Sequence, residues 1–243
     1  MVSNVHIDRY SGSRDREFAI VFAPGLVTKG RSERIFRSAV DTLREQGMPI
    51  TTLTYGYTSH EKLTLSGFEN DLADLEVLAG SLEKEGIQRN RIGFMGTCYG
   101  AYLVAQHIET HPGTPFGILA EPYFGVQSLA QPYRMLSRKV SALPTAIGKK
   151  IKIPSTHHGK VSHWIPLQAL SRFVKKNVAL NDKVPTLAFL TGVHSFFCHA
   201  SINADLKRMN STQVTIGPEY ILNEDSSVFS RNIGPFLERI GMQ

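Results

Sequence analysis

Cysteine is scarce in this chain: the 243 residues include two, Cys98 and Cys198. Two thiols cannot build the disulfide framework of a small secreted domain, so we expect a protein of a reducing, cytoplasmic setting. The sequence also lacks a basic-then-apolar leader pattern, an apolar run near the ~20 residues that span a bilayer, and any internal repeat. These absences argue against a disulfide scaffold, a membrane-spanning protein and a repeat protein.

Acidic residues are nearly absent from one segment. Residues 123–183 hold eleven Lys and Arg but one acid, Asp182, so the segment carries about +10 while the whole chain carries +6. Such asymmetry indicates a basic surface that faces an anionic partner, or simply a solvated basic face. No nucleic-acid motif occurs and the aromatic residues do not interleave with the basic ones, so we expect no nucleic-acid partner.

The rest of the chain alternates between strand and helix patterns. Continuous apolar runs are typical of strands buried on both faces, and apolar residues at three- and four-residue spacing predict helices. Strands are expected at 4–10, 17–23, 50–55, directly before Gly96, 116–120, 185–190 and 213–216, and helices at 31–46, 67–85, 99–109, 201–209 and 227–240. This alternation predicts an α/β fold with a mostly parallel sheet and helices on both faces, with ligands beyond the carboxyl ends of the strands.

The alternation stops in the basic segment. Residues 123–183 contain several prolines and only weak helical patterns, at 129–140 and 166–178. We therefore expect two parts: a core of residues 1–122 and 184–243, and a basic helical cap inserted at 123–183.

One stretch carries the chemistry. Gly96-Thr97-Cys98-Tyr99-Gly100 has the spacing of the nucleophile elbow G-x-S-x-G, with Cys in place of Ser. It lies between a predicted strand and a predicted helix, so Cys98 stands at a helix N-terminus, which favours the thiolate. The stretch fits neither G-x-G-x-x-G nor a phosphate-binding loop. The alternative interpretation is a buried structural cysteine.

With these features the chain resembles the α/β-hydrolase fold over nearly its whole length. The resemblance rests on the elbow, on the buried strand that ends in Pro24-Gly25-Leu26, and on an insertion between the family's sixth and seventh strands. Cysteine elbows occur in dienelactone-hydrolase-like and polyester-synthase-like members. The resemblance implies Cys98 as nucleophile and an oxyanion hole from the backbone N–H groups of Tyr99 and Leu26.

The usual partners of the nucleophile are missing. The family places an acid after its seventh strand and a histidine after its last, but residues 191–195 contain no carboxylate and residues 211–243 contain no histidine. A rebuilt triad could use His194, or His199 close behind, as the base. Its acid would then be Asp225, the adjacent Glu224, or Glu121 at the end of the sixth strand.

Other histidines give further alternatives. His157, His158 and His163, with Trp164, form a cluster in the cap that could position substrate or supply the base. Their spacing matches no known metal site, and we expect no metal and no cofactor. His107 and His111 lie four residues apart, a spacing that can bind metal, but we interpret them as surface residues at a helix C-terminus.

These residues predict a cysteine-dependent enzyme that acts on an ester or thioester by acyl transfer, acyl elimination or hydrolysis. A thiolate accepts an acyl group readily but releases it to water slowly without a strong base. The alternative is a non-catalytic pseudohydrolase that binds an acyl carrier, a coenzyme-A-like molecule or another anionic ligand. The basic cap would suit coenzyme A or an acidic acyl carrier protein that delivers a small acyl substrate, and equally a membrane surface.

Overall fold

The structure is a computed structural model. It describes residues 6–11, 17–25, 29–55, 68–122, 124, 128, 131, 134–135, 150–154, 162–166, 178, 181–191, 199–209, 211–216 and 226–242.

Among the described residues, seven strands build the main sheet. They are β1 (His6–Asp8), β2 (Phe18–Ala23), β3 (Ile50–Thr54), β4 (Ile92–Thr97), β5 (Gly117–Ala120), β8 (Thr186–Thr191) and β9 (Ser211–Ile216). Their order in the sheet is β1-β3-β2-β4-β5-β8-β9. β1 pairs antiparallel with β3, and the other neighbours pair parallel. Every residue of β2, β3, β4 and β5 is buried, as is typical of the central strands of a parallel sheet. β2 is accordingly a continuous apolar run, whereas β3 buries three threonines.

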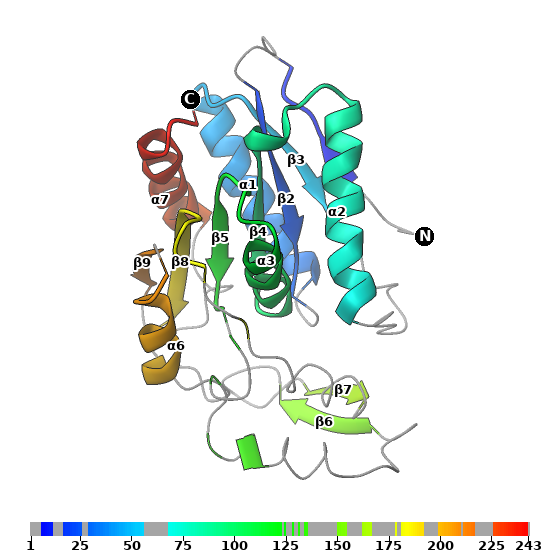
Figure 1. The fold of residues 1–243 in the computed structure, drawn as a ribbon, viewed down its shortest axis with the longest axis vertical. Coiled ribbons are helices and arrows are strands. Elements are labelled where there is room, and N and C mark those ends of the chain that lie inside the picture. Colours follow the sequence, from blue (N-terminus) through cyan, green and yellow to red (C-terminus); the bar gives the residue numbers. More distant parts are fainter. Residues whose placement is uncertain are drawn as a thin grey trace.

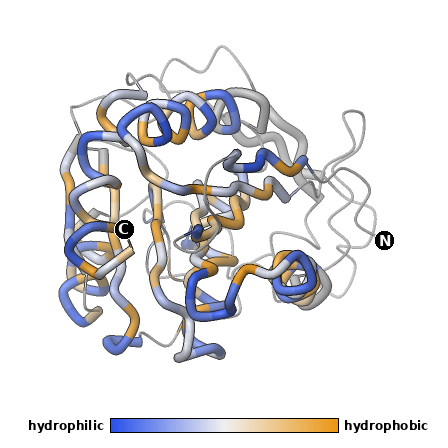
Figure 2. Tube along the Cα trace, turned by 90° about the horizontal axis from the view of Figure 1, so that it is seen from above, coloured by the Kyte–Doolittle hydropathy of each residue, from blue (hydrophilic) through white to orange (hydrophobic). Residues whose placement is uncertain are grey.

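Helices cover both faces of this sheet (Figure 1). The helices of one face are α2 (Phe68–Lys84), α3 (Tyr99–Thr110) and α6 (His199–Leu206), and those of the other are α1 (Lys29–Glu45) and α7 (Ser226–Arg239). The outer helices are hydrophilic on part of their circumference and hydrophobic on the rest (Figure 2). The structure thus confirms the predicted α/β fold, a mostly parallel sheet with helices on both faces.

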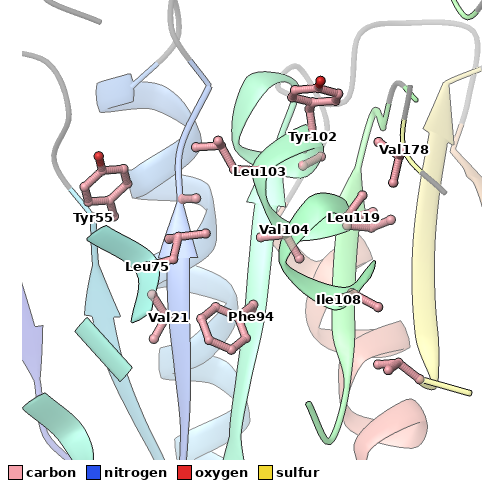
Figure 3. Close-up of a cluster of buried hydrophobic side chains, with 14 of the residues drawn as sticks. Val21, Tyr55, Leu75, Phe94, Tyr102, Leu103, Val104, Ile108, Leu119 and Val178 are labelled. Carbon is pink, nitrogen blue, oxygen red and sulfur yellow. The ribbon is translucent and has the colours of Figure 1, made fainter. Parts of the chain in front are cut away.

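The core under α3 is the larger of the two. Leu103, Val104 and Ile108 of α3 pack against the strand residues Phe94 and Leu119 (Figure 3). Ten consecutive residues of α3, Tyr99 to Ile108, are buried. A helix buried on all sides over nearly three turns holds its first residue in a fixed place, and that residue follows Cys98.

Glycines end the two longest helices in the same way. Gly47 follows α1 with φ 91° and Gly86 follows α2 with φ 99°, both in the left-handed region. After α1, the N–H of Met48 donates to the Leu43 carbonyl and that of Gly47 to the Arg44 carbonyl. This is the Schellman pattern, which satisfies the last carbonyls of a helix and favours glycine.

The inserted segment contains strands that the sequence analysis missed. β6 (Lys150–Pro154) and β7 (Ser162–Pro166) form a separate antiparallel pair. The pair lies on the side of the main sheet toward which the arrows of β2, β5 and β8 point (Figure 1). The predicted helical cap thus also contains a strand pair, and the described residues Gln131, Arg134 and Met135 in it are helical. Most of the two predicted cap helices falls outside the described residues.

The segment leaves and rejoins the core at one place. The N–H of Val178 donates to the carbonyl of Phe124 at 3.1 Å, and both side chains are buried in the core under α3. That residues 123–183 form a separate unit stays a prediction. No described helix has both the length and the apolar character needed to cross a membrane.

Candidate active site

The predicted elbow is present and strained. Cys98 lies between β4 and α3 with φ 51° and ψ −110°, a backbone conformation that residues other than glycine rarely adopt. Its N–H donates to the Ala120 carbonyl at 2.9 Å, and its carbonyl accepts from the N–H of Tyr102 at 3.1 Å. The half-buried thiol is therefore fixed at the carboxyl edge of the sheet, where parallel sheets bind ligands.

Two glycines let the turn close. A Cβ at Gly96 would lie 2.2 Å from the backbone of Gly100, and a Cβ at Gly100 would lie 1.8 Å from the carbonyl oxygen of Ala23. The first contact joins strand to helix within the elbow, and the second joins the helix to the end of β2. Because Pro24 and Gly25 follow directly, the loop that leads to Leu26 begins beside Gly100, two residues after Cys98.

A buried carboxylate holds the residue after the nucleophile. The hydroxyl of Tyr99 donates to Asp71 at 2.7 Å, and that of Tyr55 donates to Asp71 and to Asp74, each at 3.1 Å. Asp71 is fully buried. Burial and then the charges of Asp71 and Asp74 raise the pKa of Tyr55, so it stays a neutral donor. Sequence reasoning missed this cluster, although Asp71 lies on the helical stripe of Leu75, Leu78 and Leu82.

Glu121 lies beside the elbow. It follows Ala120, whose carbonyl accepts from Cys98, and it has φ 51° and is 5% exposed. Burial first, and then the Glu121 charge, raise the pKa of Cys98 to about 12, while the N–H of Tyr99 directed at the sulfur lowers it. The resting thiolate that the helix N-terminus favours is thus not what the structure shows: burial and the carboxylate outweigh the helix, and the thiol is protonated at neutral pH.

The other predicted site residues fall outside the described part of the chain. Leu26, His194, Asp225, Glu224, His157 and His158 are not described, and His163, Trp164 and His199 are described in backbone only. The structure therefore brings together Cys98, Tyr99 and Glu121 among the predicted residues. The roles of the others stay predictions.

One histidine prediction is wrong. His107 is not a surface residue: it is fully buried between the sheet and the helices that cover it. His111, one turn later, is partly exposed as expected, and both lie close to Glu76 of α2. The spacing predicted a shared face correctly, but it did not reveal that α2 covers this end of α3.

Comparisons with known proteins bear on the fold. No protein-family model and no curated protein sequence matches the chain. Among solved structures it is similar to Est1E from Butyrivibrio proteoclasticus with bound ferulic acid, at 12% identity and a TM-score of 0.67 over 99% of this chain and 96% of that one. It is also similar to a soluble variant of monoglyceride lipase from Saccharomyces cerevisiae in complex with a substrate analogue, at 9% identity and a TM-score of 0.69 over 97% of this chain and 91% of that one. A third similar structure is the α/β hydrolase GrgF from Penicillium sp. sh18, at 12% identity and a TM-score of 0.65 over 97% of this chain and 98% of that one. At these identities the likeness establishes the α/β-hydrolase fold.

The glycine contacts give a paired test of the elbow. Gly100→Ala should destabilise the protein by about 3 kcal/mol or more, because the new methyl group meets backbone atoms that cannot move away independently. Gly80→Ala is the matched control within α2, where a Cβ meets nothing within 4 Å. It should stabilise by about 0.5–1 kcal/mol through helix propensity. Urea unfolding measures both changes, and equal effects would contradict the described close approach.

The carboxylate beside the thiol gives a second prediction. Glu121→Gln removes the charge with little change of shape, so the pKa of Cys98 should fall and its alkylation by iodoacetamide at pH 8 should become about three- to tenfold faster. Peptide-resolved mass spectrometry separates Cys98 from Cys198. Glu45→Gln, at an exposed position on α1, should leave the rate unchanged. A Glu121→Gln rate equal to that of the wild type would show that Glu121 does not act on the thiol.

Proposed function

We propose that this chain is an enzyme in which Cys98 attacks the carbonyl carbon of an ester or thioester and holds the acyl group as a thioester. The observation that carries the proposal is the backbone of Cys98, held at φ 51° in a strand-to-helix turn. Strain of this kind costs on the order of 1–3 kcal/mol and persists where the surrounding structure enforces it, typically at functional sites. A structural cysteine would gain nothing from that conformation.

An oxyanion hole supports the same reaction. The Tyr99 N–H, directed at the sulfur in the resting state, is the first proposed donor. The backbone N–H of Leu26 is the second. In support of this role, Gly100 approaches the Ala23 and Pro24 carbonyls, so the loop that carries Leu26 starts at the elbow. Asp71 positions Tyr99 through the side-chain hydroxyl and thereby steadies the first donor.

The attacking thiol needs a base because it is protonated. We assign this role to His194, which follows β8 in sequence, with Asp225 or Glu121 to orient it. His194 takes the thiol proton as the sulfur–carbon bond forms. The bond from the acyl carbon to the leaving oxygen or sulfur then breaks, and the leaving group receives the proton. The negative Glu121 would also favour the protonated form of a histidine placed between it and the thiol.

The fate of the acyl group follows from the acceptor. Water as acceptor gives hydrolysis, and another nucleophile gives acyl transfer. Acyl elimination would instead bypass the thioester: a base removes a proton from the substrate, and the acyl group leaves as a carboxylate while a double bond forms. The basic cap of residues 123–183 would attract an anionic carrier such as coenzyme A or an acyl carrier protein. In this proposal His157, His158, His163 and Trp164 of the cap contact the substrate.

One observation favours a second function. A thiol whose pKa is raised to about 12 is a poor resting nucleophile, which suits a pseudohydrolase that binds an acyl carrier or another anionic ligand without reaction. The two functions differ in whether Cys98 becomes acylated.

Intact-mass spectrometry distinguishes them. After incubation with p-nitrophenyl butyrate, the wild type should gain the mass of one butyryl group, and neutral hydroxylamine should remove it as expected for a thioester. Cys98→Ala should gain nothing. Cys198→Ala, the matched control, should be acylated like the wild type. Equal labelling of the wild type and Cys98→Ala would reject the nucleophile and leave the binding function.

A further inference from the structure

A group of metal-binding side chains lies at the end of α3 remote from Cys98. Glu76 of α2 and His107 and His111 of α3 each offer one ligand atom, and these atoms all lie within 4.8 Å of one another. Nothing in the proposed acyl chemistry uses these residues. α3 starts at the nucleophile and ends at this group, so the two sites lie on opposite edges of the sheet.

His107 is the buried member of the group. Its side chain is 0% exposed, and neither ring nitrogen has a hydrogen-bond partner. Its Nδ1 lies 3.2 Å from Oε1 of Glu76, but the two atoms are not aligned for a hydrogen bond. Burying an imidazole with neither nitrogen paired costs free energy of folding, unless a ligand binds one of the nitrogens.

His111 lies close to the same carboxylate. Its Nδ1 lies 3.1 Å from the His107 carbonyl and 2.9 Å from Oγ1 of Thr110. Toward the carbonyl Nδ1 donates, whereas toward the hydroxyl it can also accept, so the two tautomers of His111 differ in which of these contacts carries the proton. In the tautomer that donates from Nδ1 to the carbonyl, Nε2 presents a lone pair to Oε1 of Glu76 at 3.5 Å. Two lone pairs facing each other repel, whereas a cation between them would bind both. A ligating histidine commonly donates its other N–H to a backbone carbonyl, as here.

The spacing also fits a small divalent ion. Bonds of about 2.0–2.2 Å in a tetrahedral shell separate neighbouring ligand atoms by about 3.4 Å. Two of the three separations match this value: Nδ1 of His107 and Nε2 of His111 lie 3.2 and 3.5 Å from Oε1 of Glu76. The separation of the two histidine ligand atoms is bounded only by 4.8 Å. Two imidazoles and one carboxylate form a ligand set that suits Zn²⁺ better than Mg²⁺ or Ca²⁺.

We infer that Glu76, His107 and His111 bind a Zn²⁺-like divalent cation, with water in the remaining position. This proposal departs from the sequence-based expectation of no metal. Arg89 holds the carboxylate in place, because one guanidinium nitrogen lies 2.7 Å from both oxygens of Glu76. Such hydrogen bonds to a ligating carboxylate are usual around metals.

Binding requires one local adjustment. The rings of His107 and His111 are stacked, with centroids 4.4 Å apart and planes 11° from parallel. In-plane lone pairs of parallel rings do not meet at one point, so the His111 ring must turn toward the ion. The His111 ring can turn because its side chain is 40% exposed. The His107 ring is held in place because it packs on the ring of Phe94, with the two ring centroids 4.0 Å apart.

A bound ion would stabilise the packing of α2 against α3. An ion held by Glu76 and the two histidines joins α2 to α3, which also meet at Asp71 and Tyr99 near the elbow. Because it binds the folded state and not the unfolded chain, the ion would stabilise the protein by mass action. This effect does not depend on whether Cys98 is a nucleophile.

A zinc titration tests the site. The chelator-treated wild type should bind one equivalent of Zn²⁺ in competition with a fluorescent indicator, and Zn²⁺ should raise its melting temperature. His111→Ala and Glu76→Gln should each weaken this binding at least tenfold and abolish the rise. Circular dichroism in the presence of chelator establishes that both variants are folded.

The chain offers a matched control. The double variant His157→Ala/His158→Ala removes two of the three cap histidines and should still bind one equivalent of Zn²⁺. Co²⁺ in place of Zn²⁺ should give visible bands of a nitrogen and oxygen site without a thiolate charge-transfer band. Any of four results would overturn the inference. The wild type could fail to bind one equivalent of Zn²⁺, both site variants could bind it unchanged, the cap variant could lose binding, or the Co²⁺ spectrum could contain a thiolate band.

Discussion

The close approach of α3 to β2 is the constraint on which the rest of the site depends. Gly100 lies against the carbonyl of Ala23, and Gly96 lies against the backbone of Gly100, so neither position has room for a side chain. Because helix and strand meet there, the connecting residue must turn sharply, and Cys98 takes the left-handed conformation. The same contact brings the end of β2 to the elbow. One steric requirement thus places the thiol, the N–H of Tyr99 and the start of the loop to Leu26 at one edge of the sheet.

Much of this arrangement could be predicted from the sequence. The apolar run that forms β2 and the helical stripe that forms α7 depend on burial, which leaves a periodic pattern in the chain. The elbow could be predicted because close packing demands small residues at fixed spacing. Glu121 could be placed because it ends a buried strand next to β4.

What could not be predicted depends on contacts between distant segments. The burial of His107 results from α2 and the sheet enclosing the end of α3, and no local pattern encodes that. Asp71 stands on an apolar stripe, but its partners Tyr55 and Tyr99 come from other elements. The strand β6 was missed for a different reason: Lys150-Ile151-Lys152-Ile153 alternates with the two-residue period of a strand, and the surrounding weak helical patterns concealed it.

The protonation of Cys98 joins the geometry to the chemistry. If burial and Glu121 keep the thiol protonated, the reaction needs a base at the moment of attack, and the site is not a thiolate site. The most direct measurement is a titration of thiolate ultraviolet absorbance, taken as the difference between the wild type and Cys98→Ala. The account predicts no Cys98 ionisation between about pH 6 and pH 10. An ionisation step near or below neutral pH would contradict it.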